Sequence, residues 1–161
     1  WRIAPQVAFS TFLRYVDAGL YAGAGFYRSV RRDNDRGTPG IEVIQGGLLD
    51  DGRSLPPVAH EPTSATGLKH RNGSLSLARG APGTGGGAAF FICIGDQPGL
   101  DAGARRNPDG QGFAAFGRVV DGMDVVRRIH AAPTDADRGG VYVRGQLLRA
   151  PVLIERAERL P

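Results

Sequence analysis

The sequence is poor in cysteine and has no long hydrophobic run. Cys93 is the only cysteine among 161 residues, which excludes a disulfide bond within the chain. Its place in the apolar run from Phe90 to Ile94 indicates a small buried hydrophobic side chain. No stretch of about 18 apolar residues occurs, so we expect no membrane-spanning helix and no membrane partner. These absences exclude the disulfide-rich scaffold and the helical membrane protein.

Lysine is almost missing, because Lys69 is the only one, and the positive charge therefore comes from arginine. The formal net charge is +4. Arginine pairs well with phosphate, so such an excess can indicate binding to nucleic acid. The arginines are nevertheless scattered as single residues or short pairs, with no basic run interleaved with aromatic residues. We interpret them as a solvated surface and expect no nucleic-acid partner.

Recognisable patterns of metal ligands and nucleophiles are missing too. His60, His70 and His130 are far apart without metal-like spacing, and we expect each at the surface or in a loop. No Gly-x-Ser-x-Gly segment is present. The glycine-rich stretch 80–87 lacks the Gly-Lys-Ser/Thr ending of a phosphate-binding loop, and we interpret it as a flexible surface loop. We therefore expect neither a metal nor a cofactor.

The composition that remains is that of an ordinary globular domain, with 41% hydrophobic and 22% charged residues. The length fits a single domain over residues 1–161. Because the chain begins with Trp1 and not with Met, we expect it to be processed or trimmed. Residues 47–69 and 96–112 form two long connections, and such loops usually bind a ligand or cover a site.

Hydrophobic spacing predicts two helices and several short strands. Ala8, Phe12 and Val16 recur at helical spacing over residues 7–18, and residues 121–130 fit a second helix. Short apolar or alternating runs separated by Gly, Pro, Asn and Asp indicate an all-β barrel or sandwich. These runs are Phe26–Val30, Ile41–Gln45, Ser74–Arg79, Phe90–Ile94, Ala114–Val120 and Val152–Arg156.

Four groups of segments, in order along the chain, resemble the cyclophilin-type peptidyl-prolyl isomerases. They are Phe12-Leu13-Arg14-Tyr15-Val16 with Gly19-Leu20-Tyr21; Phe26-Tyr27-Arg28; Val43-Ile44-Gln45-Gly46-Gly47; and Phe90-Phe91-Ile92 with Phe116-Gly117-Arg118-Val119-Val120 and Gly122-Met123-Asp124-Val125-Val126. The resemblance implies a mainly β fold, an eight-stranded antiparallel β-barrel capped by two α-helices.

The N-terminal end departs from that pattern. The family usually begins with a strand that pairs with the last strand, whereas only Trp1-Arg2-Ile3 precedes the first helix here. We therefore expect the first strand to be missing and Val152–Arg156 to have an unpaired edge. A trimmed sequence, a swapped or borrowed strand and an open barrel are the three explanations that the sequence leaves open.

The resemblance implies catalysis of cis-trans isomerisation at peptide bonds that precede proline. Amide resonance sets an uncatalysed barrier of about 18–20 kcal/mol. A catalyst has to favour the twisted bond, in which the prolyl nitrogen becomes pyramidal and accepts a hydrogen bond. A rigid, always charged arginine fork suits this task, and an apolar pocket holds the ring. No metal, cofactor or covalent intermediate is required.

The same resemblance assigns the site residues. Arg28 is expected to be the electrostatic catalyst, with Gln45 as the polar partner that steadies it or the substrate carbonyl. Phe91 is expected to form the floor of the proline pocket. The other substrate-binding residues are Val43, Leu100 and Phe113 as walls, Ala78 and Arg79 along the groove for the substrate backbone, and Glu42 and Ala89 at further pocket positions of the family.

Several pocket positions differ from the family. Glu42 replaces a pocket phenylalanine, Val43 a methionine, and Ala89 a glutamine that hydrogen-bonds the substrate. Arg79 replaces an asparagine, Gly99 a tryptophan, and Phe113 a histidine or tyrosine. Losing the glutamine removes a hydrogen bond of about 0.5–1.5 kcal/mol. For Glu42 two interpretations stay open, orienting Arg28 or pulling it away from the substrate.

We expect a monomeric isomerase of proline-containing peptides and unfolded protein chains that assists folding. The alternative is a catalytically weak or inactive module of the same fold that binds proline-containing segments. Different small-molecule chemistry on the same barrel is a third hypothesis. For the compartment, the sequence favours the bacterial periplasm slightly over the cytoplasm.

Overall fold

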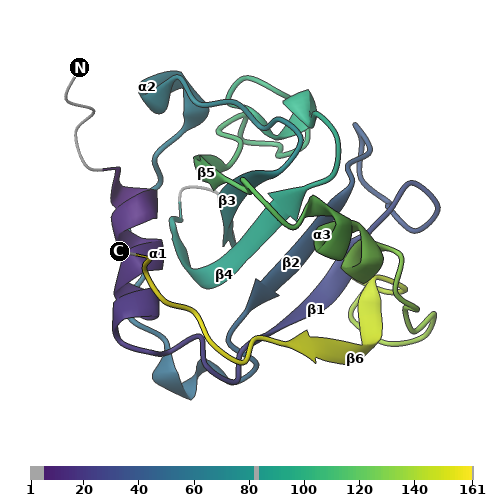
Figure 1. Cartoon of the computed structure of the whole chain (residues 1–161). Coiled ribbons are helices and arrows are strands. Elements are labelled where there is room, and N and C mark those ends of the chain that lie inside the picture. The colour runs from purple at the N-terminus through teal and green to yellow at the C-terminus, as the bar shows by residue number, and fades with distance from the viewer. Residues whose placement is uncertain (1–5, 82–83, 161) are drawn as a thin grey trace.

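The structure is a computed structural model that describes residues 6–81 and 84–160. Within these residues the chain forms six strands, three α-helices and two short 3-10 turns (Figure 1). The strands are β1 (Gly25–Val30), β2 (Val43–Gly47), β3 (Ser74–Arg79), β4 (Gly86–Cys93), β5 (Ala114–Arg118) and β6 (Leu147–Leu153). The helices are α1 (Val7–Asp17), α2 (Thr63–Thr66) and α3 (Met123–His130), and the turns are η1 (Asp51–Arg53) and η2 (Pro98–Leu100).

All six strands belong to one antiparallel sheet with the order β5-β3-β4-β2-β1-β6. Helix α1 packs against β4 and β5, and α3 packs against β1 and β2. The mainly β fold with two principal helices is as the resemblance implies. The described residues form an open sheet with β5 and β6 as its two edges and not the closed eight-stranded barrel of the family; the last strand, β6, is an edge strand, as expected from the missing first strand. Trp1-Arg2-Ile3, which precede the first helix where the family has its first strand, lie outside the described residues.

The last strand begins earlier than the sequence indicates. The prediction of Val152–Arg156 is wrong in its bounds, since β6 spans Leu147–Leu153. Leu147 pairs with Arg28 and Val152 with Phe26 in the neighbouring strand β1. A proline within β6 interrupts its apolar pattern, so the sequence did not indicate the first half of the strand. An edge strand tolerates proline because its N–H groups need not all be paired.

An aromatic cluster joins α1 to the sheet. The Phe12 ring centroid lies 5.3 Å from that of Tyr21, 5.2 Å from that of Phe90 and 5.1 Å from that of Phe116. The Tyr21 hydroxyl donates to the carbonyl oxygen of Ala88 at 3.0 Å, which satisfies the polar end of an otherwise buried ring. This core supports the face of the sheet opposite to the cavity described below.

The two glycines after Gln45 permit close packing of the central strands. A Cβ atom on Gly46 would lie 2.9 Å from Cδ1 of Phe26, and one on Gly47 would lie 2.9 Å from Cα of Ala89. Gly47 also has a φ of +149°, which side chains rarely allow. The two glycines therefore let β2 lie tightly between β1 and β4.

No helix in the described part of the chain is both long enough and apolar enough to cross a membrane.

We expect Phe12→Ala to lower the free energy of unfolding by about 3 kcal/mol, because the substitution removes three aromatic contacts and leaves a cavity. Phe9→Ala on the same helix is the matched control, since the Phe9 side chain is exposed, and it should cost less than about 1 kcal/mol. Urea unfolding measures both. Equal losses would show that the helix, and not the cluster, determines the effect.

Candidate active site

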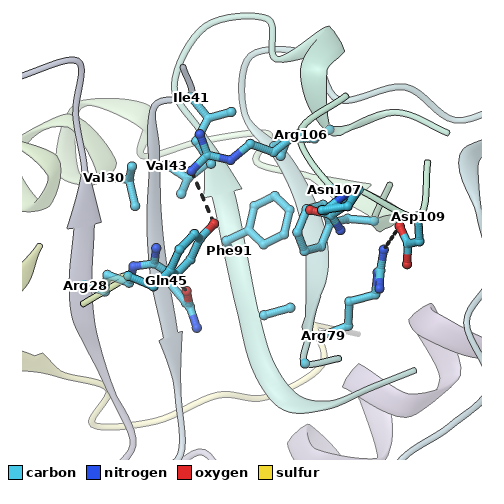
Figure 2. A pocket seen from close by; sticks show the side chains of 16 residues that line it. Arg28, Val30, Ile41, Val43, Gln45, Arg79, Phe91, Arg106, Asn107 and Asp109 are labelled. Atoms are coloured by element: carbon cyan, nitrogen blue, oxygen red, sulfur yellow. Dashed lines mark hydrogen bonds and ion pairs between the residues drawn. The ribbon is translucent and has the colours of Figure 1, made fainter. Parts of the chain in front are cut away.

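A cavity of about 290 Å³ lies against β1, β2, β3 and β4, near the lower end of the range of about 300–1,000 Å³ typical of ligand pockets. Figure 2 shows Phe91 in its centre, with Arg28 and Gln45 on one side and Arg79 with Asp109 on the other. Its lining residues are Arg28, Val30, Ile41, Val43, Gln45, Ala78, Arg79, Gly80, Phe91, Leu100, Arg106, Asn107, Pro108, Asp109, Phe113 and Tyr142. Every predicted site residue except Glu42 and Ala89 is among them.

A β-bulge places Arg28 on the cavity side of the sheet. Phe26 pairs with Gly46, but Arg28 pairs with Gln45, so the register shifts at Tyr27. Regular alternation would put Phe26 and Arg28 on the same face of the strand. The extra residue reverses this, so Phe26 packs in the aromatic core and Arg28 lines the cavity.

The Arg28 guanidinium is held by two side-chain amides. Its Nη1 donates to Oε1 of Gln45 at 2.8 Å, while its Nε and Nη2 both donate to Oε1 of Gln146 at 2.9 and 2.7 Å. Three of the five N–H bonds of the guanidinium are used in this way. One hydrogen on Nη1 and one on Nη2 are left for a further acceptor.

Arg28 differs from the other arginines of the cavity in its charge balance. Arg79 donates to Asp109 at 2.8 Å, and Arg106 forms two hydrogen bonds of 2.7 Å with Asp35. Arg28 has no carboxylate partner within 4.0 Å among the residues that the structure describes. Burial lowers the pKa of Arg28, with Tyr142 opposing that effect, but an arginine stays protonated in proteins. The cavity therefore presents one positive charge without a counter-charge.

Apolar side chains form the floor and the walls opposite Arg28. The ring centroids of Phe91 and Phe113 lie 5.3 Å apart in an edge-to-face arrangement, and both rings pack in one cluster with Val43 and Leu100. Phe91, Val43 and Leu100 are each less than 5% exposed. This surface can hold an apolar ring beside a charged donor.

His70 lies in a loop, as the sequence predicted, but it is buried beneath the floor of the cavity and not at the surface. His130, by contrast, is the last residue of helix α3 and is partly buried, contrary to the expectation of a surface or loop position. His70 is 1% exposed, and its ring lies nearly parallel to that of Phe91 with centroids 5.8 Å apart. Nδ1 lies 2.8 Å from Asp101 and Nε2 lies 3.0 Å from Ser76. Burial lowers the pKa of His70 despite the opposing Asp101, so the ring is neutral at neutral pH, donating to Asp101 and accepting from Ser76.

This serine, histidine and aspartate are arranged as in a hydrolase triad but cannot act as one. Ser76 is 0% exposed and lies behind the floor of the cavity, so no substrate carbonyl reaches its hydroxyl. The arrangement holds Phe91 in place.

Arg79 forms a wall of the cavity and is tied down. Besides Asp109, it donates from Nε to the carbonyl oxygen of Gly112 at 2.8 Å, and its guanidinium carbon lies 5.5 Å from the centre of the Phe113 ring. Its side chain is 2% exposed. The charges of Arg79 and Arg106 are therefore balanced by carboxylates within the protein.

Neither interpretation of Glu42 describes its place in the structure. Its carboxylate accepts from Nε of Arg32 at 3.1 Å, on the outside of the cavity and away from Arg28. Ala89 is half-buried and does not line the cavity. At Gly99, a Cβ atom would lie 2.6 Å from Cγ of Pro39, so that ring occupies the space that a larger side chain would need.

Sequence analysis did not identify several residues at or beside the cavity, because loops distant in sequence bring them there; they include the lining residues Arg106 and Tyr142 and the Arg106 partner Asp35. Arg106 lies in the predicted long connection 96–112, Asp35 follows β1, and Tyr142 lies between α3 and β6. The Tyr142 ring lies 5.4 Å from the guanidinium carbon of Arg28, and its hydroxyl accepts from Arg106 at 3.4 Å. The loop 96–112 thus supplies a wall of the cavity, as its length indicated. The other long connection, 47–69, contributes no lining residue.

The Asp35–Arg106 pair braces these loops and gives a pH-dependent prediction. Burial alone would raise the pKa of Asp35, but hydrogen bonds from Arg106 and from the N–H groups of Ile41 and Gly37 lower it below its ordinary value. A carboxylate with a lowered folded pKa stabilises the protein above the ordinary pKa of about 3.9. That stabilisation is lost as the pH falls through the lowered value.

We expect Asp35→Asn to lower the free energy of unfolding at pH 7 by about 3–5 kcal/mol, because Arg106 is left buried and unpaired. The difference from wild type should shrink as the pH is lowered below about 4. Urea unfolding of both proteins between neutral and acidic pH measures it. A difference that does not change with pH would contradict an ionised Asp35 as the cause.

Comparison with known proteins agrees with the fold and shows the family. The family model described as cyclophilin type peptidyl-prolyl cis-trans isomerase matches residues 1–157. A peptidyl-prolyl cis-trans isomerase of Streptomyces antibioticus is 34% identical over 98% of this chain and 87% of its own length. Isomerase A of Dickeya dadantii is 33% identical over 80% of this chain, which spans 62% of that relative.

A solved structure shows the same fold. The Cryptosporidium parvum cyclophilin type isomerase, crystallised in the presence of the dipeptide Ala-Pro, aligns with a TM-score of 0.53 at 20% identity, covering 90% of this chain and 83% of that one. The sequence motifs, the sheet with its two helices and the family match over nearly the whole length lead to one conclusion. This chain belongs to the family of cyclophilin-type peptidyl-prolyl cis-trans isomerases.

Proposed function

We propose that this chain catalyses cis-trans isomerisation of peptide bonds that precede proline. The observation that carries the proposal is the Arg28 guanidinium, which has no carboxylate partner among the described residues and borders a cavity with an apolar floor. The family and the names of the bacterial relatives support the same activity. The catalytic and binding roles of individual residues are part of the proposal.

Arg28 would act by stabilising the twisted peptide bond. When the bond rotates, amide resonance is lost and the lone pair of the prolyl nitrogen becomes an acceptor. The two hydrogens that Gln45 and Gln146 leave on Nη1 and Nη2 suit that nitrogen and the adjacent carbonyl oxygen. Because the nitrogen is not an acceptor in the planar ground state and becomes one only as the bond twists, the hydrogen bond to it favours the transition state.

The apolar floor would hold the proline ring still while the other half of the bond turns. Phe91, Phe113 and Leu100 offer a closely packed surface without polar groups of their own. A ring fixed there anchors the prolyl side, so rotation is confined to the preceding carbonyl. Partial exclusion of water also strengthens the attraction between Arg28 and the nitrogen.

The substrates we propose are proline-containing peptides and unfolded chains, bound by a monomer. Uncatalysed isomerisation takes tens of seconds, so such an activity would assist folding. Ala78 and Arg79 would line the groove for the substrate backbone, and Val43 and Gln45 the opposite wall. Glu42 and Ala89 lie outside the cavity lining, and we give them no direct part in holding the proline. The compartment, periplasm or cytoplasm of a bacterium, stays a prediction.

We expect the wild type to accelerate the cis-to-trans reaction of a short Ala-Pro-Phe peptide, and Arg28→Ala to lower kcat/KM by about 10²–10³-fold, the usual loss of a transition-state donor. Arg128→Ala is the matched control, because Arg128 is exposed on α3 and pairs only with Asp124, and its activity should equal that of wild type. The circular dichroism spectrum of each variant verifies folding.

Two results would contradict the proposal. A folded wild type that binds proline peptides without acceleration would leave the binding module as the function. A fully active Arg28→Ala variant would keep the isomerase and remove its proposed catalyst.

A further inference from the structure

We infer that Gln146 is the positioning residue that fixes Arg28 for catalysis, an inference that rests on the isomerase activity proposed above. The residue does not line the cavity, and it lies 118 positions away from Arg28 in the sequence. It acts through the guanidinium and would not touch the substrate.

Gln146 accepts hydrogen bonds from both nitrogens along one edge of the Arg28 guanidinium. Its Oε1 accepts from Nε at 2.9 Å and from Nη2 at 2.7 Å, whereas Gln45 accepts only from Nη1, at 2.8 Å. Two bonds to one oxygen fix the orientation of the planar group in a way that a single bond cannot. Together the two amides leave one hydrogen on Nη1 and one on Nη2 for the substrate.

Gln146 is itself held on both sides. Its side-chain Nε2 donates to the carbonyl oxygen of Asn34 at 3.0 Å, which fixes Oε1 toward Arg28 because a carbonyl only accepts. Its backbone carbonyl accepts from the N–H of Ser29 at 2.9 Å, next to Arg28 on β1, and its own N–H donates to Val143 at 3.0 Å. The residue is 1% exposed. This is the rigid support that a catalytic group needs.

The amide matters because it orients Arg28 without cancelling its charge. Two neighbouring arginines of the cavity, Arg79 and Arg106, are held by carboxylates and are thereby neutralised. A carboxylate at position 146 would offer Arg28 a similar partner and would compete with the prolyl nitrogen. The Gln146 amide orients Arg28 without cancelling its charge, because its oxygen is a neutral acceptor and its nitrogen donates to a fixed partner.

The first test is Gln146→Met, which keeps the length of the side chain and removes both bonds to Arg28. We expect kcat for an Ala-Pro-Phe peptide to fall by about 10–100-fold with little change in KM, since a misplaced donor affects the transition state. Gln97→Met is the control, because Gln97 is also buried and its side chain bonds only to the carbonyl oxygen of Ile94. Its kcat should stay within about twofold of wild type.

The second test is Gln146→Glu, which retains an acceptor for Arg28 and adds a negative charge. We expect kcat to fall at least as far as in Gln146→Met, although Arg28 stays in place. A purely structural role would instead be rescued by this conservative change. Recovery of wild-type kcat in Gln146→Glu would therefore overturn the requirement for a neutral amide.

A third readout does not depend on activity. The NMR signal of the Arg28 Nε–H group, assigned by its loss in Arg28→Ala, should shift and exchange faster with water in Gln146→Met, while signals of the aromatic core stay unchanged. In the Arg28→Ala background, Gln146→Met should cause no further loss of kcat, because the two residues act as one unit.

The possible failures are distinguishable. An active wild type with a fully active Gln146→Met variant, or an unmoved Arg28 signal, would overturn the inference and leave the isomerase standing. A wild type without activity would overturn the proposed function and this inference with it.

Discussion

The organisation of the site depends on how the charge of one half-buried arginine is accommodated. Arg28 is held by the amide oxygens of Gln45 and Gln146 and by no carboxylate among the described residues. The amide oxygens satisfy three of its N–H bonds and leave its positive charge without a counter-charge. The bulge at Tyr27, the buried position of Gln146 and the close approach of β1 to β2 all serve this single arrangement.

The arginines in the walls of the cavity, in contrast to Arg28, are paired with carboxylates. Arg79 and Arg106 each find a carboxylate, Asp109 and Asp35, and both guanidinium groups are almost fully covered. Removing one member of such a buried pair is costly because the other is left without its counter-charge. These pairs therefore fix the loops, whereas the charge of Arg28 stays available for chemistry. The apolar floor is stabilised separately, by the neutral His70 beneath Phe91.

The departures from the family change the rim of the site more than its centre. Glu42 turns outward to Arg32, and Pro39 fills the space beside Gly99. The Tyr142 ring lies over one face of the Arg28 guanidinium. The centre keeps an amide-held arginine beside packed aromatic rings, the two features on which the proposed isomerase mechanism rests.

The sequence by itself indicated the principal helices, the approximate places of the strands and half of the residues that line the cavity. The spacing of apolar residues located α1, α3 and the short strands, because burial of one face imposes a period on the sequence. The ordered motifs assigned Arg28, Gln45 and Phe91, and the structure brings all three to one cavity. The bounds of β6 were predicted wrongly, because a proline interrupts its apolar pattern. The loop position of His70 was predicted but its burial was not, because a polar ring in a loop can be buried once its hydrogen bonds are satisfied. Only the tertiary structure decided that Gln146, Tyr142 and the Asp35–Arg106 pair meet at the site. The sequence of their loops has no hydrophobic periodicity. Their contacts join segments that are far apart in the chain, and a local sequence pattern cannot predict such contacts.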